Sequence, residues 1–160
     1  MLSVSKQMGL NLIEMKQMLD RIFLDTNIIL YSYSEDDIYK QNISQEILRN
    51  NIFNTFISKQ VINEITNILF KKIKLSSEEV ENAILELDSE FEIFDFYLTT
   101  QIKAIRLKKD YNLQFYDALI IATALENNCT ILYSEDMQHN LIIEGKLTII
   151  NPFKALDEQN

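Results

Sequence analysis

Glycine, histidine and cysteine are scarce in this chain, and their scarcity excludes several kinds of site. The 160 residues include two glycines, Gly9 and Gly145, which lie far apart. A phosphate-binding loop or a dinucleotide-binding fingerprint needs several glycines close together, so both are excluded. One histidine, His139, and one cysteine, Cys129, cannot build a structural zinc site. His139 follows Ser134 and Asp136 too closely to resemble a known catalytic triad, although spacing alone does not forbid one.

The chain also lacks long apolar runs. The longest helical run, Ala118 to Leu125, is too short to cross a bilayer and contains a threonine. The N-terminus has no charged start followed by an apolar stretch and a small-residue cleavage site, so it does not resemble a signal peptide. A single cysteine rules out an internal disulfide. Together these features predict a protein of the reducing cytoplasm with no membrane partner.

Carboxylates, by contrast, are abundant. The chain has 24 Asp and Glu residues against 15 Lys and Arg residues, and its formal net charge is −9. This balance argues against a simple nucleic-acid-binding module, which would usually be basic. It does not argue against a nuclease, because carboxylates that bind divalent cations attract phosphate once the cations are bound. An acidic surface can also recognise a basic protein partner.

The pattern of apolar residues alternates between strands and helices. Short apolar runs predict strands at residues 22–24, 53–57, 91–94, 129–133 and 147–150. The segments with helical periodicity are 36–50, 59–74, 99–109 and 115–127, and a further helix begins at the capping sequence of residues 76–79. Such alternation predicts an α/β fold with a mainly parallel sheet of about five strands and helices on both faces.

Domain boundaries follow from the same pattern. No repeat or linker interrupts the chain, and Pro152 is its single proline. We expect one domain at residues 21–153 and a C-terminal tail at residues 154–160. Residues 1–20 form an N-terminal extension with two interpretations. Its apolar residues could form an amphipathic helix that packs on the domain, or Met18 could be the true start, which leaves three residues between it and the first strand.

Three acidic residues follow predicted strands. Asp25 ends the first strand, Glu64 lies in the first turns of the helix after the second, and Asp136 comes just after the fourth. In an open parallel sheet, ligands bind beyond the carboxyl ends of the strands, so these residues belong on one edge. Asp117 begins the helix that precedes the fourth strand, and topology alone does not bring it to that edge.

Asp25 and Asp117 have apolar surroundings that make an unpaired carboxylate costly. Asp25 follows three apolar residues, and Asp117 begins the most apolar helix of the chain. Structural alternatives exist for both. Asp25 could end a strand before Thr26 or Asn27 caps the next helix, and Asp117 could simply stabilise a helix dipole.

Glu64 and Asp136 carry weaker local signals. Glu64 falls at the edge of the apolar face of its helix, where a solvated side chain is the simpler interpretation. Asp136 lies in the polar segment Ser134-Glu135-Asp136, where it could cap a helix and where Glu135 is a competing acid. The residues alone leave these alternatives open.

A cluster of carboxylates predicts a metal site. Oxygen ligands select hard cations such as Mg²⁺ or Mn²⁺. Without a cation, neighbouring carboxylates repel one another and some of their pKa values must rise. Bound cations lower the pKa of water and stabilise charge on a phosphoryl group, which makes phosphodiester hydrolysis the natural reaction class.

Four segments in order resemble the PIN-domain family, in particular the VapC-type toxins of toxin–antitoxin pairs. The segments are residues 23–31, 58–64, 115–124 and 131–136, and they extend the resemblance over residues 21–153. The third, an aromatic-Asp-Ala block on an apolar helix, is distinctive. The first is weak alone, but all four in order form a strong signature.

The resemblance implies a three-layer α/β/α sandwich with a central acidic pocket that holds Mg²⁺ or Mn²⁺ and cleaves RNA. The positions that match the family's catalytic and metal-binding acids are Asp25, Glu64, Asp117 and Asp136. The supporting polar residues are Thr26, Asn27 and Ser134. The resemblance further leads us to expect the toxin of a type II pair, with a cognate antitoxin and a homodimeric assembly.

Basic residues gather on one predicted helix, at Lys103, Arg106, Lys108 and Lys109. They could hold RNA phosphates beside the acidic pocket, although a solvated helix face is the simpler interpretation. Two alternative functions remain. One is a non-catalytic PIN-like module that binds a protein partner through its acidic surface, and the other is a PIN nuclease without a toxin role.

Overall fold

A single six-stranded sheet organises the protein, whose computed structural model describes residues 20–154. The strand order is β3-β2-β1-β4-β6-β5. The strands are β1 (Ile22–Leu24), β2 (Thr55–Ser58), β3 (Glu92–Phe94), β4 (Ile131–Tyr133), β5 (Ile142–Ile143) and β6 (Leu147–Ile150). All neighbouring pairs are parallel except β5 and β6, which are antiparallel.

The five predicted strands are present, and the sixth was not predicted. Strand β5 has two residues, too few to show an apolar alternation in the sequence. It pairs with β6 through a tight turn in which Glu144 and Gly145 have positive φ angles of 52° and 65°. The expectation of about five strands is therefore corrected to five parallel strands and one short antiparallel strand.

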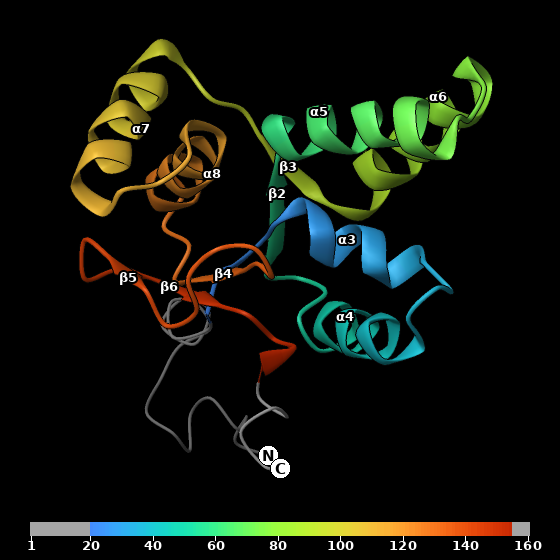
Figure 1. Ribbon diagram of the computed structural model, residues 1–160, viewed down its shortest axis with the longest axis horizontal. Coiled ribbons are helices and arrows are strands. Elements are labelled where there is room, and N and C mark those ends of the chain that lie inside the picture. The colour runs from blue at the N-terminus through green and yellow to red at the C-terminus, as the bar shows by residue number, and fades with distance from the viewer. Residues whose placement is uncertain (1–19, 155–160) are drawn as a thin grey trace, which may run out of the picture.

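Six α-helices in residues 20–154 cover both faces of the sheet and complete a three-layer α/β/α sandwich (Figure 1). They are α3 (Thr26–Tyr33), α4 (Ile38–Asn50), α5 (Lys59–Ile68), α6 (Ser77–Glu90), α7 (Leu98–Tyr111) and α8 (Phe115–Glu126). Helices α7 and α8 lie side by side, as do α3 and α4. The predicted fold class is confirmed.

Two helical segments differ from the prediction. For helix α3 the sequence offered only a cap at Thr26 or Asn27 and no extent, because its Ile28-Ile29-Leu30-Tyr31 run reads equally well as a strand. The helix predicted at residues 59–74 continues past α5 as a π-helical segment, η1 (Leu69–Ile73), and ends where Lys74 adopts a φ of 62°. The predicted cap of α6 is correct, since Ser76 and Glu79 form a reciprocal capping box.

The sheet places a switch point beside β1. From β1 the chain goes to β2 on one side, and it later returns to β4 on the other. The backbone N–H of Asp25 donates to the carbonyl of Tyr133 at 3.0 Å, so the ends of β1 and β4 stay joined. Ligand sites of open parallel sheets lie at such points, beyond the carboxyl ends of the strands.

Helix α8 forms much of the core next to this edge. All eight residues from Ala118 to Leu125 are buried, which explains why the helix is apolar on every side. Cys129, just after α8, is 2% exposed, and burial raises the pKa of its thiol to about 12.

Within residues 20–154, no helix is both long and apolar enough to cross a membrane. Apart from Asp20 and Lys154, the predicted N-terminal extension and C-terminal tail lie outside the described residues, and so do both interpretations of the N-terminus.

Candidate active site

Asp25 lies at the carboxyl end of β1 and is the N-cap of α3. Its Oδ1 accepts a hydrogen bond from the backbone N–H of Thr26 at 2.7 Å, and its Oδ2 accepts one from Ser134 Oγ at 2.6 Å. The side chain is buried, and this burial raises the pKa of Asp25 to about 6; the nearby carboxylates of Glu64 and Asp117 act in the same direction. Asp25 itself, rather than Thr26 or Asn27, caps the helix.

Glu64 turns toward Asp25 from α5. Its Oε2 accepts a hydrogen bond from Thr26 Oγ1 at 2.6 Å, and its Oε1 accepts one from Gln60 Nε2 at 3.1 Å. The residue is half-buried. Glu64 is therefore held between two polar side chains next to Asp25, and it is not a freely solvated flank of its helix.

Asp117 lies in the first turn of α8, directly before the buried part of that helix. Burial raises its pKa, and the charges of Glu64 and Asp136 raise it further. Asp117 also contributes to the raised pKa of Asp25. The helix whose position topology left open thus brings its carboxylate into the same acidic group.

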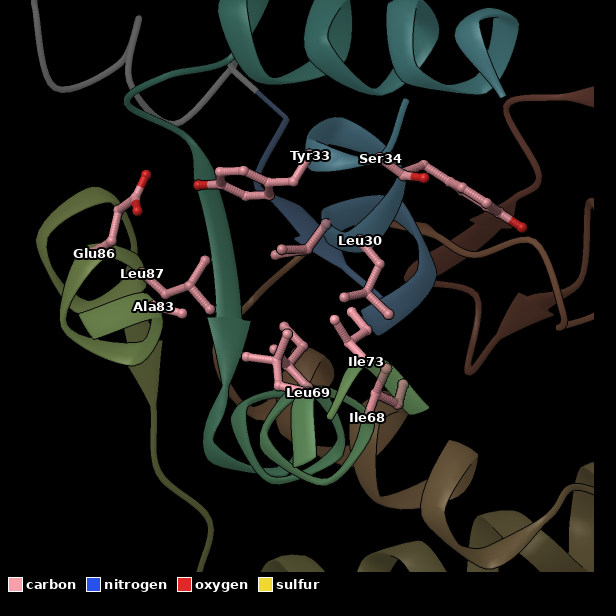
Figure 2. Close-up of a pocket in the computed structure, with 12 residues that line it drawn as sticks. Leu30, Tyr33, Ser34, Ile68, Leu69, Ile73, Ala83, Glu86 and Leu87 are labelled. Carbon is pink, nitrogen blue, oxygen red and sulfur yellow. The ribbon is translucent and has the colours of Figure 1, made fainter. Parts of the chain in front are cut away.

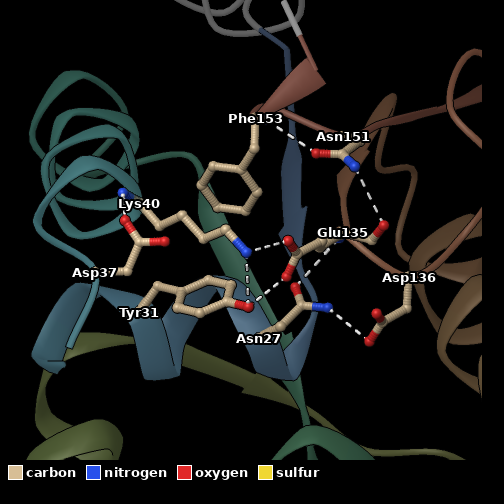
Figure 3. A network of polar contacts seen from close by, with 8 residues as sticks. All are labelled: Asn27, Tyr31, Asp37, Lys40, Glu135, Asp136, Asn151 and Phe153. Carbon is tan, nitrogen blue, oxygen red and sulfur yellow. Dashed lines mark hydrogen bonds and ion pairs between the residues drawn. The ribbon is translucent and has the colours of Figure 1, made fainter. Parts of the chain in front are cut away.

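Asp136 completes the group from the loop after β4. Its Oδ2 accepts a hydrogen bond from Asn27 Nδ2 at 3.1 Å, and the side chain is exposed. Its rival, Glu135, points the other way and contacts Lys40 and Tyr31 (Figure 3). Of the two adjacent acids, Asp136 is the one that faces Asp117.

The three predicted supporting residues each connect parts of this group. Thr26 binds Asp25 through its backbone and Glu64 through its hydroxyl. Ser134 is fully buried; it donates to Asp25 and accepts the backbone N–H of Met137 at 3.3 Å. Asn27 links the carboxylate of Asp136 to the backbone of the same loop.

The acidic quartet, meaning Asp25, Glu64, Asp117 and Asp136, has the donor chemistry of a hard-cation site. All its donors are oxygens, which suits Mg²⁺ or Mn²⁺. Within residues 20–154, none of the four forms an ion pair with Lys or Arg. No three of the described His, Cys, Asp or Glu side chains are spaced to enclose a metal ion. The quartet fits a divalent cation by its oxygen donors and its uncompensated negative charge.

The basic residues of α7 lie outside this arrangement. Lys103 pairs with Glu144 at 3.4 Å, and Lys108 donates to the carbonyl of Leu113 at 3.2 Å. Arg106 and Lys109 are exposed. In the described part of the chain, no hydrogen bond or ion pair connects these four residues to the quartet, so their proposed RNA contact stays a prediction.

Sequence reasoning missed several residues next to the quartet. Lys40 and Tyr31, which engage Glu135, lie 95 and 104 positions away from it, and no sequence spacing reveals that contact. Gln60 could have been found, because it lies one helical turn before Glu64 on the same face of α5.

An apolar groove opens between α3, η1 and α6. Its volume is about 390 Å³, and Figure 2 shows side chains from these segments converging on it. Leu30, Leu69, Ile73 and Leu87 are among its apolar walls. At the same face, the Tyr33 hydroxyl donates to Glu90 at 2.9 Å. Helix α3 therefore begins at the quartet and runs into this groove.

The sequence model of the PIN domain matches residues 22–142, so the chain belongs to the PIN-domain family. No curated protein matches the chain.

Solved structures share the fold. VapC20 of Mycobacterium tuberculosis, described as a Sarcin-Ricin loop cleaving toxin, is 15% identical with a TM-score of 0.59, over 69% of this chain and 86% of that one. A Klebsiella pneumoniae toxin-antitoxin complex is 21% identical with a TM-score of 0.63, over 82% and 97%. VapBC2 of Rickettsia felis, bound to a promoter DNA fragment, is 22% identical with a TM-score of 0.57, over 80% and 96%.

Proposed function

We propose that this protein is a metal-dependent endoribonuclease that hydrolyses RNA phosphodiester bonds. The observation that carries the proposal is the quartet itself, four carboxylates from separate parts of the chain gathered at the switch point without a cationic partner in the described residues. Membership of the PIN-domain family supports a nuclease, and the solved structure described as a Sarcin-Ricin loop cleaving toxin supports the substrate class.

In this proposal the quartet and its supporting residues have different roles. Asp25 and Asp117 bind Mg²⁺ or Mn²⁺ directly, while Glu64 and Asp136 complete the shell or orient water. The cation supplies Lewis acidity, which lowers the pKa of water and neutralises phosphate charge. Thr26 and Ser134 keep the oxygens of Asp25 oriented, and Asn27 does the same for Asp136.

RNA cleavage tests this assignment directly. Asp25→Asn and Asp117→Asn are each expected to lower the cleavage rate in Mn²⁺ by on the order of 100-fold or more, because each removes a charge that holds the cation. Asp110→Asn, on the exposed side of α7, is the matched control and should cleave like the parent. A quartet variant that cleaves RNA as well as the parent would refute the site.

The net charge of −9 favours one alternative, a non-catalytic module that binds a basic protein partner. Thermal unfolding in increasing Mn²⁺ separates the two functions. A saturable rise in Tm that Asp25→Asn removes supports the nuclease. No rise in the parent, together with no cleavage of RNA, supports the module.

We further propose that the protein is the toxin of a type II pair and acts in the cytoplasm as a homodimer. Several relatives of the same fold are toxin–antitoxin complexes by description, which supports a cognate antitoxin. A nuclease without a toxin role shares the same chemistry and would lack such a partner. Light scattering of the purified protein tests the dimer.

The apolar groove is the proposed binding surface for an apolar segment of the antitoxin. Ile73→Glu places a charge in the groove, whereas Ile142→Glu changes an isoleucine of similar exposure, 55% against 54%, outside it. After co-expression with a candidate antitoxin, only Ile73→Glu should lose the co-purified partner while it still cleaves RNA. Equal co-purification of both variants would place the partner elsewhere.

A further inference from the structure

One polar network beside the quartet holds Glu135 on every side (Figure 3). The backbone N–H of Glu135 donates to Asn27 Oδ1 at 3.3 Å, and its backbone carbonyl accepts from Asn151 Nδ2 at 3.2 Å. Its carboxylate accepts hydrogen bonds from the hydroxyl of Tyr31 and the ammonium of Lys40. Both the backbone and the side chain of this residue are therefore fixed.

Lys40 reaches this network from α4 across two aromatic rings. Its Nζ lies 4.6 Å from the ring centroid of Tyr31 and 5.4 Å from that of Phe153, and it donates to the Tyr31 hydroxyl at 3.2 Å. The two rings pack edge to face with centroids 5.4 Å apart. The side chains of Lys40 and Glu135 are each 24% exposed, so this ion pair is largely withdrawn from water and interacts more strongly than an open surface pair.

The fixed residue lies between two residues of the candidate site. Ser134, on one side, donates to Asp25 at 2.6 Å, and Asp136, on the other, belongs to the quartet. Asn27 holds both the backbone of Glu135 and the carboxylate of Asp136. Any shift of residue 135 is therefore transmitted to Asp25 and to Asp136.

The charge of Glu135 gives the network a second consequence. Without Lys40, Glu135 would be a fifth uncompensated carboxylate next to the quartet. It could then turn toward the same edge and compete with Asp136 for a cation, because the two side chains start from adjacent backbone positions.

We propose that Lys40 and Tyr31 are positioning residues of the active site: by holding Glu135 away from the quartet, they fix Ser134 and Asp136 for cation binding. This inference rests on the proposed metal-dependent function. It assigns a role in that function to α4, a helix that contributes no acid to the quartet.

Mn²⁺ binding measured by calorimetry tests the proposal. Lys40→Met removes the charge and keeps most of the length of the side chain, and it should weaken Mn²⁺ binding about tenfold, as loss of a residue that orients metal ligands does. Lys40→Arg should restore most of the affinity. Lys59→Met is the matched control, because Lys59 forms an exposed ion pair with Asp95 at 2.6 Å outside the network, and it should bind Mn²⁺ like the parent.

A double-mutant cycle shows whether Lys40 acts through Glu135. In a Glu135→Gln background, Lys40→Met should have little further effect on Mn²⁺ affinity. The side-chain amide resonances of Asn27 provide a metal-free measurement, since they should shift in Lys40→Met and stay in place in Lys59→Met. Tyr31→Phe should change both measurements in the same direction but less.

The possible outcomes distinguish failure of the positioning role from failure of the proposed metal-dependent function. If the parent binds Mn²⁺ and Lys40→Met binds it equally well, with unshifted Asn27 resonances, the positioning role is refuted while the nuclease proposal stands. If Lys40→Met only lowers Tm and leaves Mn²⁺ affinity intact, the network is purely structural and the role is likewise refuted. If the parent binds no Mn²⁺, both proposals fail.

Discussion

Two neighbouring acids, Glu135 and Asp136, lie in opposite electrostatic surroundings. The carboxylate of Glu135 meets the ammonium of Lys40 and the hydroxyl of Tyr31, and its charge is compensated. Asp136 receives one amide hydrogen bond and otherwise faces the acidic quartet. The protein thus neutralises one acid and leaves its neighbour uncompensated, which is expected where a cation is to supply the missing charge.

The uncompensated carboxylates of the quartet lower the free energy of unfolding of the metal-free protein. The pKa of Asp25 rises from its ordinary value of 3.8 to about 6, chiefly through burial. The folded protein therefore binds this proton more tightly than the unfolded chain does. Its free energy of unfolding falls as pH rises between these two values, by about 3 kcal/mol in all.

The largest predicted effect comes from removing the buried charge of Asp25. Asp25→Asn should raise the free energy of unfolding of the metal-free protein at pH 8 by up to about 3 kcal/mol, since asparagine keeps the helix cap without the buried charge. Urea unfolding in the presence of a chelator measures the difference. The gain should vanish below about pH 4, where Asp25 is protonated in both states, and a gain that persists there would have another cause.

A substitution in the compensated region, meaning Glu135 with Lys40 and Tyr31, should lower stability instead of raising it. Lys40→Met leaves Glu135 partly buried without its partner and should lower the free energy of unfolding by about 2 kcal/mol. The exposed Lys59–Asp95 pair is the comparison, and Lys59→Met should change stability by less than about 0.5 kcal/mol. Equal losses in the two variants would show that the aromatic surroundings of Lys40 add nothing.

The smallest predicted effect is on the pH dependence of Mn²⁺ affinity. Because Asp25 must lose its proton to bind a cation, Mn²⁺ affinity should fall about tenfold between pH 7 and pH 5, one unit below its pKa of about 6. Calorimetric titrations at several pH values measure this slope. An affinity that stays constant between pH 7 and pH 5 would contradict the assignment of this proton to Asp25.

The sequence predicted the parallel strands because each is a short apolar run that ends in polar residues, and it placed Asp25 and Asp136 at one edge for the same reason. It could not place Asp117, since a helix that precedes a strand has no fixed position at that edge. Resemblance to the family singled out Glu64, and the hydroxyl of Thr26, 38 positions away, provides its physical partner.

Other features escaped prediction for identifiable reasons. The extent of helix α3 is hidden by an apolar run that also suits a strand, and β5 is too short for any periodicity. The choice between Glu135 and Asp136 depends on Lys40, which approaches from α4 only in the folded chain. Contacts between residues far apart in the sequence leave no local pattern. The contact of Lys40 with Glu135 therefore could not be predicted, whereas the acids that follow apolar strands could.

The burial of Cys129 has a practical consequence for measuring motion in this protein. Its thiol is 2% exposed and its pKa is raised to about 12, so almost none is present as the reactive thiolate at neutral pH. The natural chain is therefore already suited to site-selective labelling. A cysteine introduced at exposed Lys109 would take up a maleimide fluorophore alone, and a second one on α4 would report distances between the two helices as Mn²⁺ is added.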